Sequence, residues 1–553
     1  MKRKPERERR AAPARLTAMA IAVAGCAAVS GSVLAASDSF SEKTFTIDGY
    51  LRGEFSWNTK NWQDTPNYND RGKMSMARAT VRVNADWRAT DSLALVAKVR
   101  ASQEYQTSFL KHLEKNGAYN YHSGARGDLM DLYNDAEIRE LYLDWKASDR
   151  VKFRFGKQQV VWGETDFFAA NDMVHGFNFT WRSFLEPANE ELRKPLIILK
   201  ANVDVPEANG ALEFFVRPGW DRKKDIGTEL EIYGGRWSSQ PYAYVDFRNI
   251  DPYDLENKQG DYEKVTGGIR WNGTTDAFNY SVSYLKTYFQ NPIMNASSNL
   301  KAFDAFGIPG APPGGWITVP SGARTLGRAD SRGLAGDIIY PLIDVYGFTA
   351  AGYAPWADAV FSTEWAYIKD APYQILPRSP SFLSQAIAPG YDGIKKKDVV
   401  AMMFRMDKNL PFVQSAFGAE KPMFFSVQLF DKWVQNYKSS ERLINSVGWG
   451  AKTKEHSLLL TGIFGLSYDS GRVIPELVVG ADLTYKGGFV VPSVTFELAK
   501  NLKWKVEYDY FWANNWRNGQ KCQFPNAASC DNAGLFGYFH NRDQFYTSLT
   551  YLF

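Results

Sequence analysis

The chain ends in Asp543-Gln544-Phe545-Tyr546-Thr547-Ser548-Leu549-Thr550-Tyr551-Leu552-Phe553, and no other segment says more about its architecture. Read alternately, Phe545, Thr547, Leu549, Tyr551 and Phe553 fall on one face. Side chains of a strand point to opposite faces in turn, so this is a strand with one apolar face. Termini of soluble domains are usually polar and frayed. A transmembrane β-barrel instead closes its last strand against its first, with one face to lipid, and we prefer this to a buried sandwich strand.

The same C-terminal strand has a second implied role. The pattern formed by Phe545, Leu549, Tyr551 and Phe553 resembles the signal by which outer-membrane barrels are recognised for insertion. The sequence therefore predicts that the barrel-insertion machinery is one partner of this chain.

The N-terminus has the features of a secretory signal peptide. A basic region is followed by an apolar run from Leu16 to about Ala28 and by the small-residue cleavage pattern Val33-Leu34-Ala35. The run is shorter than the ~20 residues of a spanning helix. We predict that residues 1–35 are removed and that residues 36–553 form a single barrel domain in the outer membrane of a Gram-negative bacterium. Cys26 lies in a lipoprotein-like box, so a lipidated N-terminus stays open as an alternative.

The composition fits a membrane barrel and excludes some other classes. The formal charge of +4 arises from the basic signal region, so the mature chain is close to neutral and nothing indicates a nucleic-acid partner. No later segment approaches 20 continuous apolar residues, and the mean hydropathy is −0.37. Strands that are apolar only at every second residue give this signature. The aromatic content of 15% fits girdles at the two membrane interfaces.

Alternating segments recur along the whole mature chain and predict an all-β, antiparallel transmembrane barrel of about 20 strands, within a range of 16–20. The predicted strands are 44–58, 76–88, 93–102, 136–146, 151–161, 196–205, 211–217, 228–236, 242–249, 262–271, 277–289, 345–353, 359–369, 398–407, 422–433, 456–466, 473–485, 489–498, 502–512 and 543–553. Short turns and long loops alternate between them, as periplasmic turns and outer loops should. Two connections depart from this alternation: 409–421 is long and 486–488 is short.

Charged side chains share the polar face of the first three strands. We predict a charge ladder in the lumen, formed by Arg52, Arg78, Arg82, Asp86, Lys98 and Arg100. Lys98 and Arg100 can meet Asp86 or other lumen acids across the ladder. We prefer a structural salt-bridge ladder to a ring that selects ions, although the second interpretation stays open.

The segment after Trp162 is too apolar for a simple outer loop. Its candidate constriction or ligand-contact residues are Trp162, Gly163, Glu164, Asp166, Phe167, Phe168, Asn171, Asp172, Trp181 and Arg193. Thr180 is a possible cap for a helix that puts Trp181, Phe184 and Leu185 on one face. Two interpretations stay open. The segment folds inward and narrows the lumen, or it is a lid over the barrel mouth that Arg193 ties to an acid.

The same region carries a resemblance to a known family. The residues concerned are Gly156, Gln158, Val160-Val161-Trp162-Gly163-Glu164, Asp166, Asn171-Asp172, Val174, Glu191-Leu192-Arg193 and Pro195, with Lys396-Lys397-Asp398-Val399, Asp407 and the stretches 361–367 and 426–430. This pattern resembles the DUF1302 family of Gram-negative outer-membrane proteins. Its members are taken to be barrels that accompany transport or degradation systems for hydrophobic compounds such as aromatics and sterols. The resemblance implies a transport role and no catalytic residues. His175-Gly176 departs from it, because the family tends to have an asparagine-proline pair there.

The remaining signals are weaker. Cys522 and Cys530 are an even pair in an exported protein and predict a disulfide in the last outer loop. The acid-rich stretch 128–135 is best read as a solvated outer loop, rather than as a site for a cation or for lipopolysaccharide counter-ions. None of the five histidines stands at a telling spacing from a serine and an acid, so we expect no enzyme, and we expect no metal and no cofactor.

Together these features predict an outer-membrane channel or transporter for small hydrophobic or aromatic compounds. Such a protein would contact outer-membrane lipid, lipopolysaccharide and its small hydrophobic or aromatic ligand, and an envelope transporter is a possible further partner. The alternative is a sealed barrel that acts as a structural or docking component of an envelope transport machine.

Overall fold

The structure is a computed structural model that describes residues 45–61, 69–116, 129–163, 165, 168, 170–186, 188–231, 235–237, 264–294, 299–301, 316–318, 338–375, 394–444, 453–513, 535–539 and 541–553. Some predictions lie outside these residues: the signal peptide with Cys26, the strand 242–249, the pair Cys522 and Cys530, and the site residues Glu164, Asp166 and Phe167.

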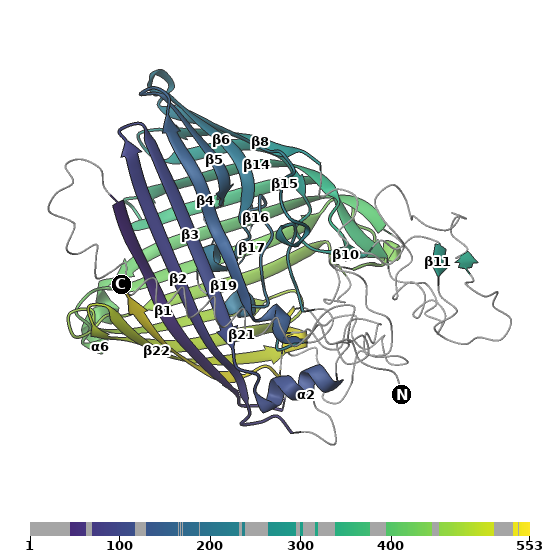
Figure 1. Cartoon of the computed structure of the whole chain (residues 1–553), viewed down its shortest axis with the longest axis vertical. Coiled ribbons are helices and arrows are strands. Elements are labelled where there is room, and N and C mark those ends of the chain that lie inside the picture. Colours follow the sequence, from purple (N-terminus) through teal and green to yellow (C-terminus); the bar gives the residue numbers. More distant parts are fainter. Residues whose placement is uncertain are drawn as a thin grey trace, which may run out of the picture.

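Within the described residues, eighteen antiparallel strands form a closed barrel, and one further short strand pairs on its margin (Figure 1). The barrel strands are β1 (Phe45–Asn58), β2 (Met74–Thr90), β3 (Leu93–Glu104), β4 (Asp135–Lys146), β5 (Val151–Gln158), β6 (Leu196–Val205), β7 (Gly210–Arg217), β8 (Thr266–Thr274), β9 (Asn279–Tyr288), β14 (Leu342–Ala354), β15 (Ala359–Ile375), β16 (Ile394–Leu410), β17 (Met423–Val434), β19 (His456–Gly465), β20 (Val473–Asp482), β21 (Gly487–Ala499), β22 (Leu502–Ala513) and β23 (Gln544–Leu552).

The elements outside the barrel wall are short. They are the strands β10 (Ile293–Met294), β11 (Asn299–Lys301), β12 (Trp316–Thr318), β13 (Ile338–Ile339) and β18 (Leu443–Ile444), the α-helices α2 (Ser108–Asn116), α4 (Asn189–Leu192), α6 (Pro411–Phe417) and α7 (Leu535–Phe539), and the 3-10 turns η2 (Leu129–Leu132), η3 (Ser183–Leu185), η4 (Pro206–Ala208), η5 (Lys223–Asp225) and η7 (Ser439–Glu441). In the part of the chain that the structure describes, no helix is both long and apolar enough to cross a membrane.

The C-terminal strand closes the barrel, as the alternation of its residues predicts. β23 pairs with β1 from Tyr50 opposite Leu552 to Asn58 opposite Gln544. Beyond this ladder, the backbone N–H of Phe553 donates to the Gly49 carbonyl at 3.1 Å, and the N–H of Gly49 donates back at 3.0 Å. A Cβ on Gly49 would lie 2.1 Å from the Arg82 carbonyl oxygen, so only glycine allows this approach. The role of this strand as an insertion signal stays a prediction.

Among the described residues the barrel has 18 strands, an even number within the expected range of 16–20, and the central estimate of about 20 is not confirmed. The described residues of the predicted strand 228–236, namely 228–231 and 235–236, do not form a wall strand, because β7 pairs directly with β8. Glu229 forms an isolated bridge with Asn178 instead, and Gly235 has a φ of 150°. Glu231 and Arg236 are both buried although they fall on opposite faces of the predicted alternation, so burial here does not follow the period of a strand.

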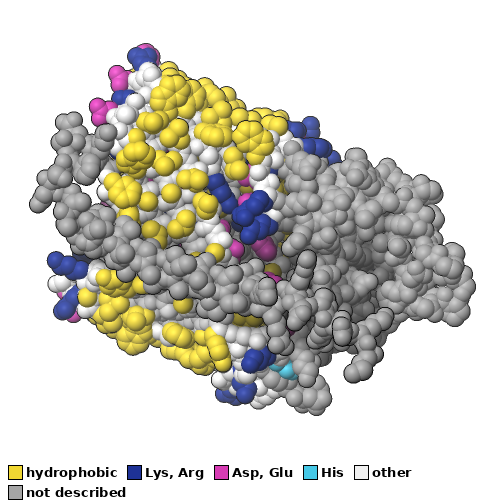
Figure 2. Space-filling view, viewed as in Figure 1, with side chains coloured by type: hydrophobic (Ala, Val, Ile, Leu, Met, Phe, Trp, Pro, Cys, Tyr) yellow, Lys and Arg dark blue, Asp and Glu magenta, His cyan; other side chains and the backbone are white. Residues whose placement is uncertain are grey.

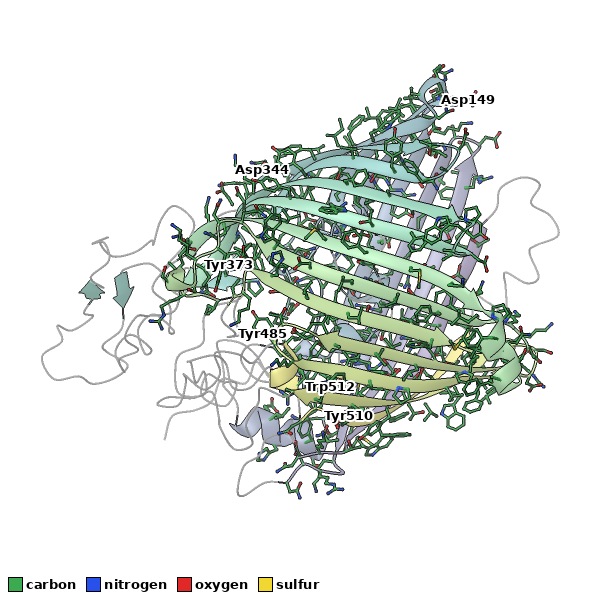
Figure 3. All side chains as sticks on the ribbon, turned by 180° about the vertical axis from the view of Figure 1, so that it is seen from behind. Asp149, Asp344, Tyr373, Tyr485, Tyr510 and Trp512 are labelled. Atoms are coloured by element: carbon green, nitrogen blue, oxygen red, sulfur yellow. The ribbon has the colours of Figure 1, made fainter. Side chains whose placement is uncertain are left out.

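The other connections largely follow the predicted alternation. Asp149 marks the short turn between β4 and β5, whereas Tyr373 and Tyr485 lie toward the opposite end of the barrel (Figure 3). The unusually long connection 409–421 contains α6, which accounts for its length. The short connection between β20 and β21 is a tight turn in which Lys486 has a φ of 58°.

The two faces of the barrel wall differ in the way a membrane barrel requires. On β1, Phe45, Leu51 and Phe55 are exposed outward, while Glu54 and Ser56 are buried on the inner face. Apolar side chains spread over the outer wall in Figure 2, with charged side chains gathered at its upper tip. Exposed aromatic residues on this surface include Trp87, Trp145, Trp365, Trp504, Tyr508, Tyr510 and Phe545. A contiguous apolar surface of this kind fits lipid rather than water.

Candidate functional site

The connection between β5 and β6, residues 159–195, is named here the β5–β6 segment. Its two limbs run beside each other: Phe177 bridges Arg193, and the Asn178 N–H donates to the Leu192 carbonyl at 2.8 Å. The predicted helix capped by Thr180 is wrong, since only the single turn η3 forms and the Thr180 hydroxyl donates to the Asn178 side chain at 2.6 Å. Contacts between its two limbs, rather than a helix, therefore shape this part of the segment.

Trp162 anchors the start of the segment against β7 and β8. Its side chain is 1% exposed, and its indole N–H donates to Glu213 at 2.5 Å. The ring packs edge-on against Phe215 with 5.3 Å between centroids. A Cβ on Gly268 of β8 would lie 2.5 Å from the Trp162 ring, so this glycine makes room for the indole. Glu213 and Phe215 alternate with the exposed Phe214 and therefore face inward.

Gly163 and Asn171 hold the next turn of the segment close to β15. The Asn171 N–H donates to the buried carboxylate of Glu364 at 3.1 Å, and its side-chain amide donates to the Trp162 carbonyl at 3.3 Å. A Cβ on Gly163 would lie 3.0 Å from the Asp172 nitrogen and 3.2 Å from Glu364, which is tighter than ordinary contact. Of the ten predicted site residues, these two and Trp162 thus share one corner.

Asp172 and Arg193 join the two limbs of the segment. Both side chains are buried, and Arg193 Nε donates to Asp172 at 3.1 Å. Next to this pair, His175 is 1% exposed and lies between the limbs. Its Nε2 accepts from the Val160 N–H at 2.8 Å, and its Nδ1 lies 2.9 Å from the Lys194 carbonyl oxygen. Burial, with the nearby Arg193, lowers the pKa of His175 to about 3, so the ring is neutral with its proton on Nδ1.

At Gly176, where the family tends to have proline, the structure leaves no room for a side chain. A Cβ at this position would lie 2.2 Å from the Gly227 carbonyl carbon. Two glycine backbones therefore meet here, and beside them the Phe177 N–H donates to the hydroxyl oxygen of Thr228 at 3.3 Å. This contact docks the 226–229 stretch onto the segment.

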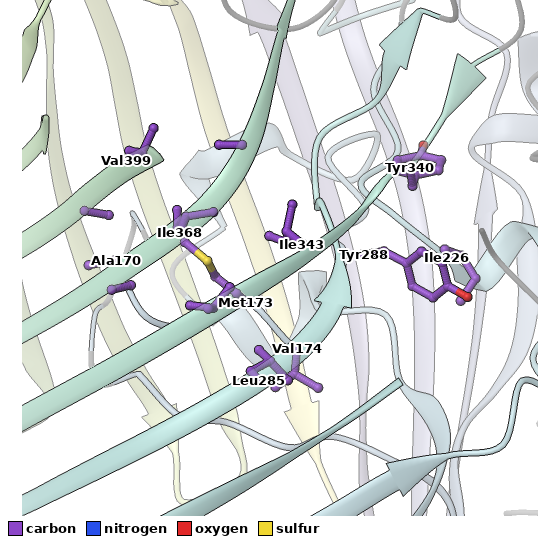
Figure 4. Close-up of a cluster of buried hydrophobic side chains, with 14 of the residues drawn as sticks. Ala170, Met173, Val174, Ile226, Leu285, Tyr288, Tyr340, Ile343, Ile368 and Val399 are labelled. Atoms are coloured by element: carbon purple, nitrogen blue, oxygen red, sulfur yellow. The ribbon is translucent and has the colours of Figure 1, made fainter. Parts of the chain in front are cut away.

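One side of the segment packs against an apolar part of the inner wall. Met173 and Val174 lie beside Ile368 and Leu285 in Figure 4. The cluster also includes, from the inner faces of the strands, Ile198, Phe215, Ile343, Val345, Ala366, Val399, Ala401, Met403 and Phe430. Phe168 reaches Phe430 with ring centroids 6.1 Å apart. An inner wall of this kind departs from the polar lumen that barrels with aqueous channels carry.

The tip of the segment meets the opposite wall. Phe184 packs against Phe489 of β21 and Phe511 of β22, with centroids 5.4 and 6.1 Å apart. Arg182 is almost fully buried and donates to Glu507 at 2.5 Å and to Asp509 at 3.3 Å. Its guanidinium lies 3.6 Å from the centre of the Tyr546 ring. The segment therefore bonds to inner-face side chains on both sides of the barrel.

Trp181 lies between two arginines of the predicted charge ladder. The guanidinium carbons of Arg78 and Arg100 are 4.6 and 4.3 Å from its ring centre. The ring is 5% exposed and clusters with Phe177 and Leu192. Its indole N–H has no hydrogen-bond partner among the described residues.

Three arginines of the predicted ladder form ion pairs with glutamates of the β5–β6 segment. Arg82 donates to Glu191 at 2.6 Å and also pairs with Glu190, while Arg100 donates to the second oxygen of Glu191 at 2.8 Å. Arg52 lies 3.8 Å from Glu186. Burial opposes ionisation of Glu191, but Arg100 and Arg82 bring its pKa down to about 2. Glu191 is thus a firmly charged group inside the barrel.

The other members of the ladder behave differently. Lys98 lies 3.3 Å from Glu140 and Arg100 2.6 Å from Glu137, so two wall carboxylates complete the network. Arg78 pairs with Glu104 at 2.9 Å. Lys98 and Arg100 thus meet other acids across the ladder, which was one of the two expected outcomes, since Glu140 and Glu137 are their partners on the neighbouring strand β4. Asp86 makes no ion pair with any described residue.

Sequence reasoning missed the acids that matter most here. Glu186, Glu190 and Glu191 were not among the expected lumen partners. The contacts that Arg182 and Phe184 of the segment make with the far wall were not expected either. The charged run Glu190-Glu191 beside Arg193 was the available signal, since paired charges in an apolar segment need buried partners.

His456 lies at the start of β19. His456 Nδ1 lies 2.7 Å from Asp431, and its ring stacks on Trp433 at 5.6 Å. Within the described residues, no cluster of His, Cys, Asp and Glu could hold a metal ion.

Comparisons with known proteins give one match that covers nearly the whole chain. The family model described as protein of unknown function (DUF1302) matches residues 15–553. No curated protein matches the chain.

Solved structures of low identity also match. OccK5 (OpdH) of Pseudomonas aeruginosa is 7% identical with a TM-score of 0.41, covering 92% of this chain and 97% of that chain. OccAB3 of Acinetobacter baumannii is 8% identical with a TM-score of 0.42, covering 92% and 99%. A loop L8 deletion mutant of OmpT, an outer membrane protein of Vibrio cholerae, is 11% identical with a TM-score of 0.34, covering 93% and 100%.

Proposed function

The chain belongs to the DUF1302 family, and we propose that it is an outer-membrane channel or transporter for small hydrophobic or aromatic compounds, its lumen narrowed by the β5–β6 segment. The observation that carries the proposal is the span of that segment. Its residues contact inner-face side chains of β2 and β3, of β7 and β15, and of β22. A barrel of 18 strands encloses a space that wall side chains alone do not fill. An element that crosses this space controls what passes through it.

The apolar part of the inner wall supports the choice of substrate class. Inward-facing Ile343, Val345 and Ile368, together with Met403 and Phe430, form a surface that water does not favour. Aromatic side chains of the segment, among them Phe168 and Phe184, continue that surface across the barrel. A compound with an apolar or aromatic body would gain by contact with this surface, whereas a sugar or an inorganic ion would not.

The alternative function is a sealed barrel that serves as a structural or docking component of an envelope transport machine. The buried ion pairs of the segment favour it, because Arg182 and Arg193 would hold a permanent plug as well as a gate. In both cases we propose a protein without enzymatic activity, exported by its signal peptide to the outer membrane of a Gram-negative cell. Lipopolysaccharide, the insertion machinery and a further envelope transporter remain proposed partners.

Conductance in a planar bilayer separates the two functions. The wild-type protein is compared with a variant that lacks residues 165–187, which include Asp172, Trp181 and Phe184. We expect the wild type to be nearly silent and the deletion variant to conduct steadily, because the segment supplies the barrier. Steady conduction by the wild type would reduce the segment to a constriction. Silence of both proteins would contradict a channel and favour the sealed barrel.

A further inference from the structure

The arginines of β2 and β3 that hold the segment form the best-developed polar site in the lumen. We propose that Arg78, Arg82 and Arg100 bind aromatic carboxylates, and that Trp181 and Glu191 of the segment occupy this site in the closed barrel. The inference rests on the proposed function and narrows its substrate class. It assigns the segment the role of an internal ligand that a substrate of the same chemistry displaces.

Arg100 contacts both parts of this internal ligand. Its guanidinium carbon lies 4.3 Å from the centre of the Trp181 ring, and its Nη1 donates to the Glu191 carboxylate at 2.8 Å. Arg82 donates to the other carboxylate oxygen at 2.6 Å. Two arginines thus bind a carboxylate, and two arginines stack on the ring beside it. An aryl carboxylate offers the same two groups to the guanidiniums.

Trp181 is held by stacking rather than by a specific hydrogen bond from its indole. The indole N–H is buried and has no partner among the described residues, and the backbone carbonyl of Trp181 receives only a 3.5 Å contact from Arg78. A buried polar group without a partner makes occupancy of the site by Trp181 less favourable than that of a plain aromatic ring. Another flat ring can therefore replace the indole at little loss.

Charge balance couples departure of the segment to an anion. Among the described residues, Arg52 has an ion pair only with Glu186, and Arg82 only with Glu190 and Glu191. If the segment leaves, both guanidiniums lose their carboxylates while they remain on the inner wall. A substrate that brings its own carboxylate restores a pair, whereas a neutral compound of equal size does not.

The arginines that stay on the wall also define the ring of the ligand. Phe177, Phe179 and Leu192 pack around Trp181 but belong to the segment and leave with it. Arg78 and Arg100, which stack on the indole in the closed barrel, remain and favour a flat ring over a short aliphatic acid or an inorganic anion. The site therefore selects molecules that are both aromatic and anionic.

Binding of 2-naphthoate to the purified, refolded full-length chain tests the proposal, with neutral 2-naphthamide as the matched probe. Fluorescence anisotropy of the naphthalene ring reports binding independently of conductance. We expect saturable binding of naphthoate that weakens with salt, and only micelle partitioning for naphthamide. In Glu191→Gln the internal carboxylate is neutral, so naphthoate should bind at least tenfold more tightly than to the wild type.

Arg154 supplies a matched control on the same wall. Its guanidinium pairs with Asp144 at 2.6 Å and lies 4.0 Å from the centre of the Tyr142 ring, so it has the same kind of contacts but none with the segment. In the Glu191→Gln background, Arg100→Gln should weaken naphthoate binding at least tenfold and Arg154→Gln should leave it unchanged. Unheated electrophoretic mobility confirms that each variant is a folded barrel.

Two results would overturn the inference. One is equal binding of naphthoate and naphthamide, and the other is equal loss of binding in the Arg100 and Arg154 variants. Failure of the proposed function has a different signature, namely silence of the variant that lacks residues 165–187. If that variant conducts while naphthoate and naphthamide bind equally, the result supports the channel and contradicts the aromatic carboxylate site.

Discussion

Arg182→Gln is expected to release the tip of the β5–β6 segment and open the barrel. Arg182 is the only cation paired with Asp509 among the described residues, and both side chains are buried. Removing one partner of a buried ion pair costs about 3 to 5 kcal/mol. Glu507 keeps a bond from Lys505 at 2.5 Å, so we expect the lower end, about 3 kcal/mol. That value shifts the docking equilibrium by a factor of roughly 100 to 200 and should appear as a matching rise in open probability in planar bilayers.

A second substitution separates this electrostatic effect from a general loss of packing. In Arg182→Gln with Asp509→Asn, a neutral amide replaces the carboxylate that lost its cation. Gln544, whose side-chain amide donates to Asp509 at 2.6 Å in the wild type, remains its neighbour. The double variant should regain most of the closed state. An open double variant would mean that the contact between Arg182 and the Tyr546 ring, at 3.6 Å, keeps the segment docked. A closed Arg182→Gln variant would show that Phe184 and its aromatic neighbours suffice.

The barrel itself could be predicted because its signal is local. The alternation in β1, β2 and β23 follows directly from the two environments of the wall, lipid and lumen, and each strand carries that signal within its own residues. The predicted strand 228–236, whose described residues form none, shows the limit of this reasoning. Glu231 and Arg236 lie on opposite faces of its apparent alternation and yet both are buried. A pattern of apolar and polar residues therefore does not by itself establish a wall strand.

The candidate site could be predicted only in part, because its contacts join distant positions. The sequence indicates that Arg82 and Arg100 face the lumen, and that the segment after Trp162 is too apolar for an outer loop. It does not indicate that Glu191 meets both arginines, since this pairing depends on how far the segment reaches. The expected ladder between adjacent strands does form from Lys98 to Glu140 and from Arg100 to Glu137, although Asp86 takes no part in it among the described residues.

Lowering the pH from 7 to 5 is expected to weaken docking of the segment by roughly 2 kcal/mol through His175 alone. The docked ring is neutral, because Nε2 accepts from Val160 and burial with Arg193 lowers its pKa to about 3. Once the segment leaves, the ring regains a pKa of about 6.5 and takes up a proton. The undocked state then binds more protons, so docking is fully present above about pH 6.5 and is lost progressively as the pH falls toward 3. Bilayer conductance should therefore rise between pH 7 and pH 5.

His175→Asn isolates this contribution, because asparagine offers a donor and an acceptor but does not titrate. Glu186 and Asp172 also lie in the segment, and burial raises the pKa of both carboxyl groups. Their protonation favours the docked state in acid, which is opposite in sign to the effect of His175. The variant should consequently lose the rise in conductance or reverse it. If the wild type and His175→Asn respond to pH alike, protonation of His175 is not what loosens the segment, and the docked ring must already accept a proton.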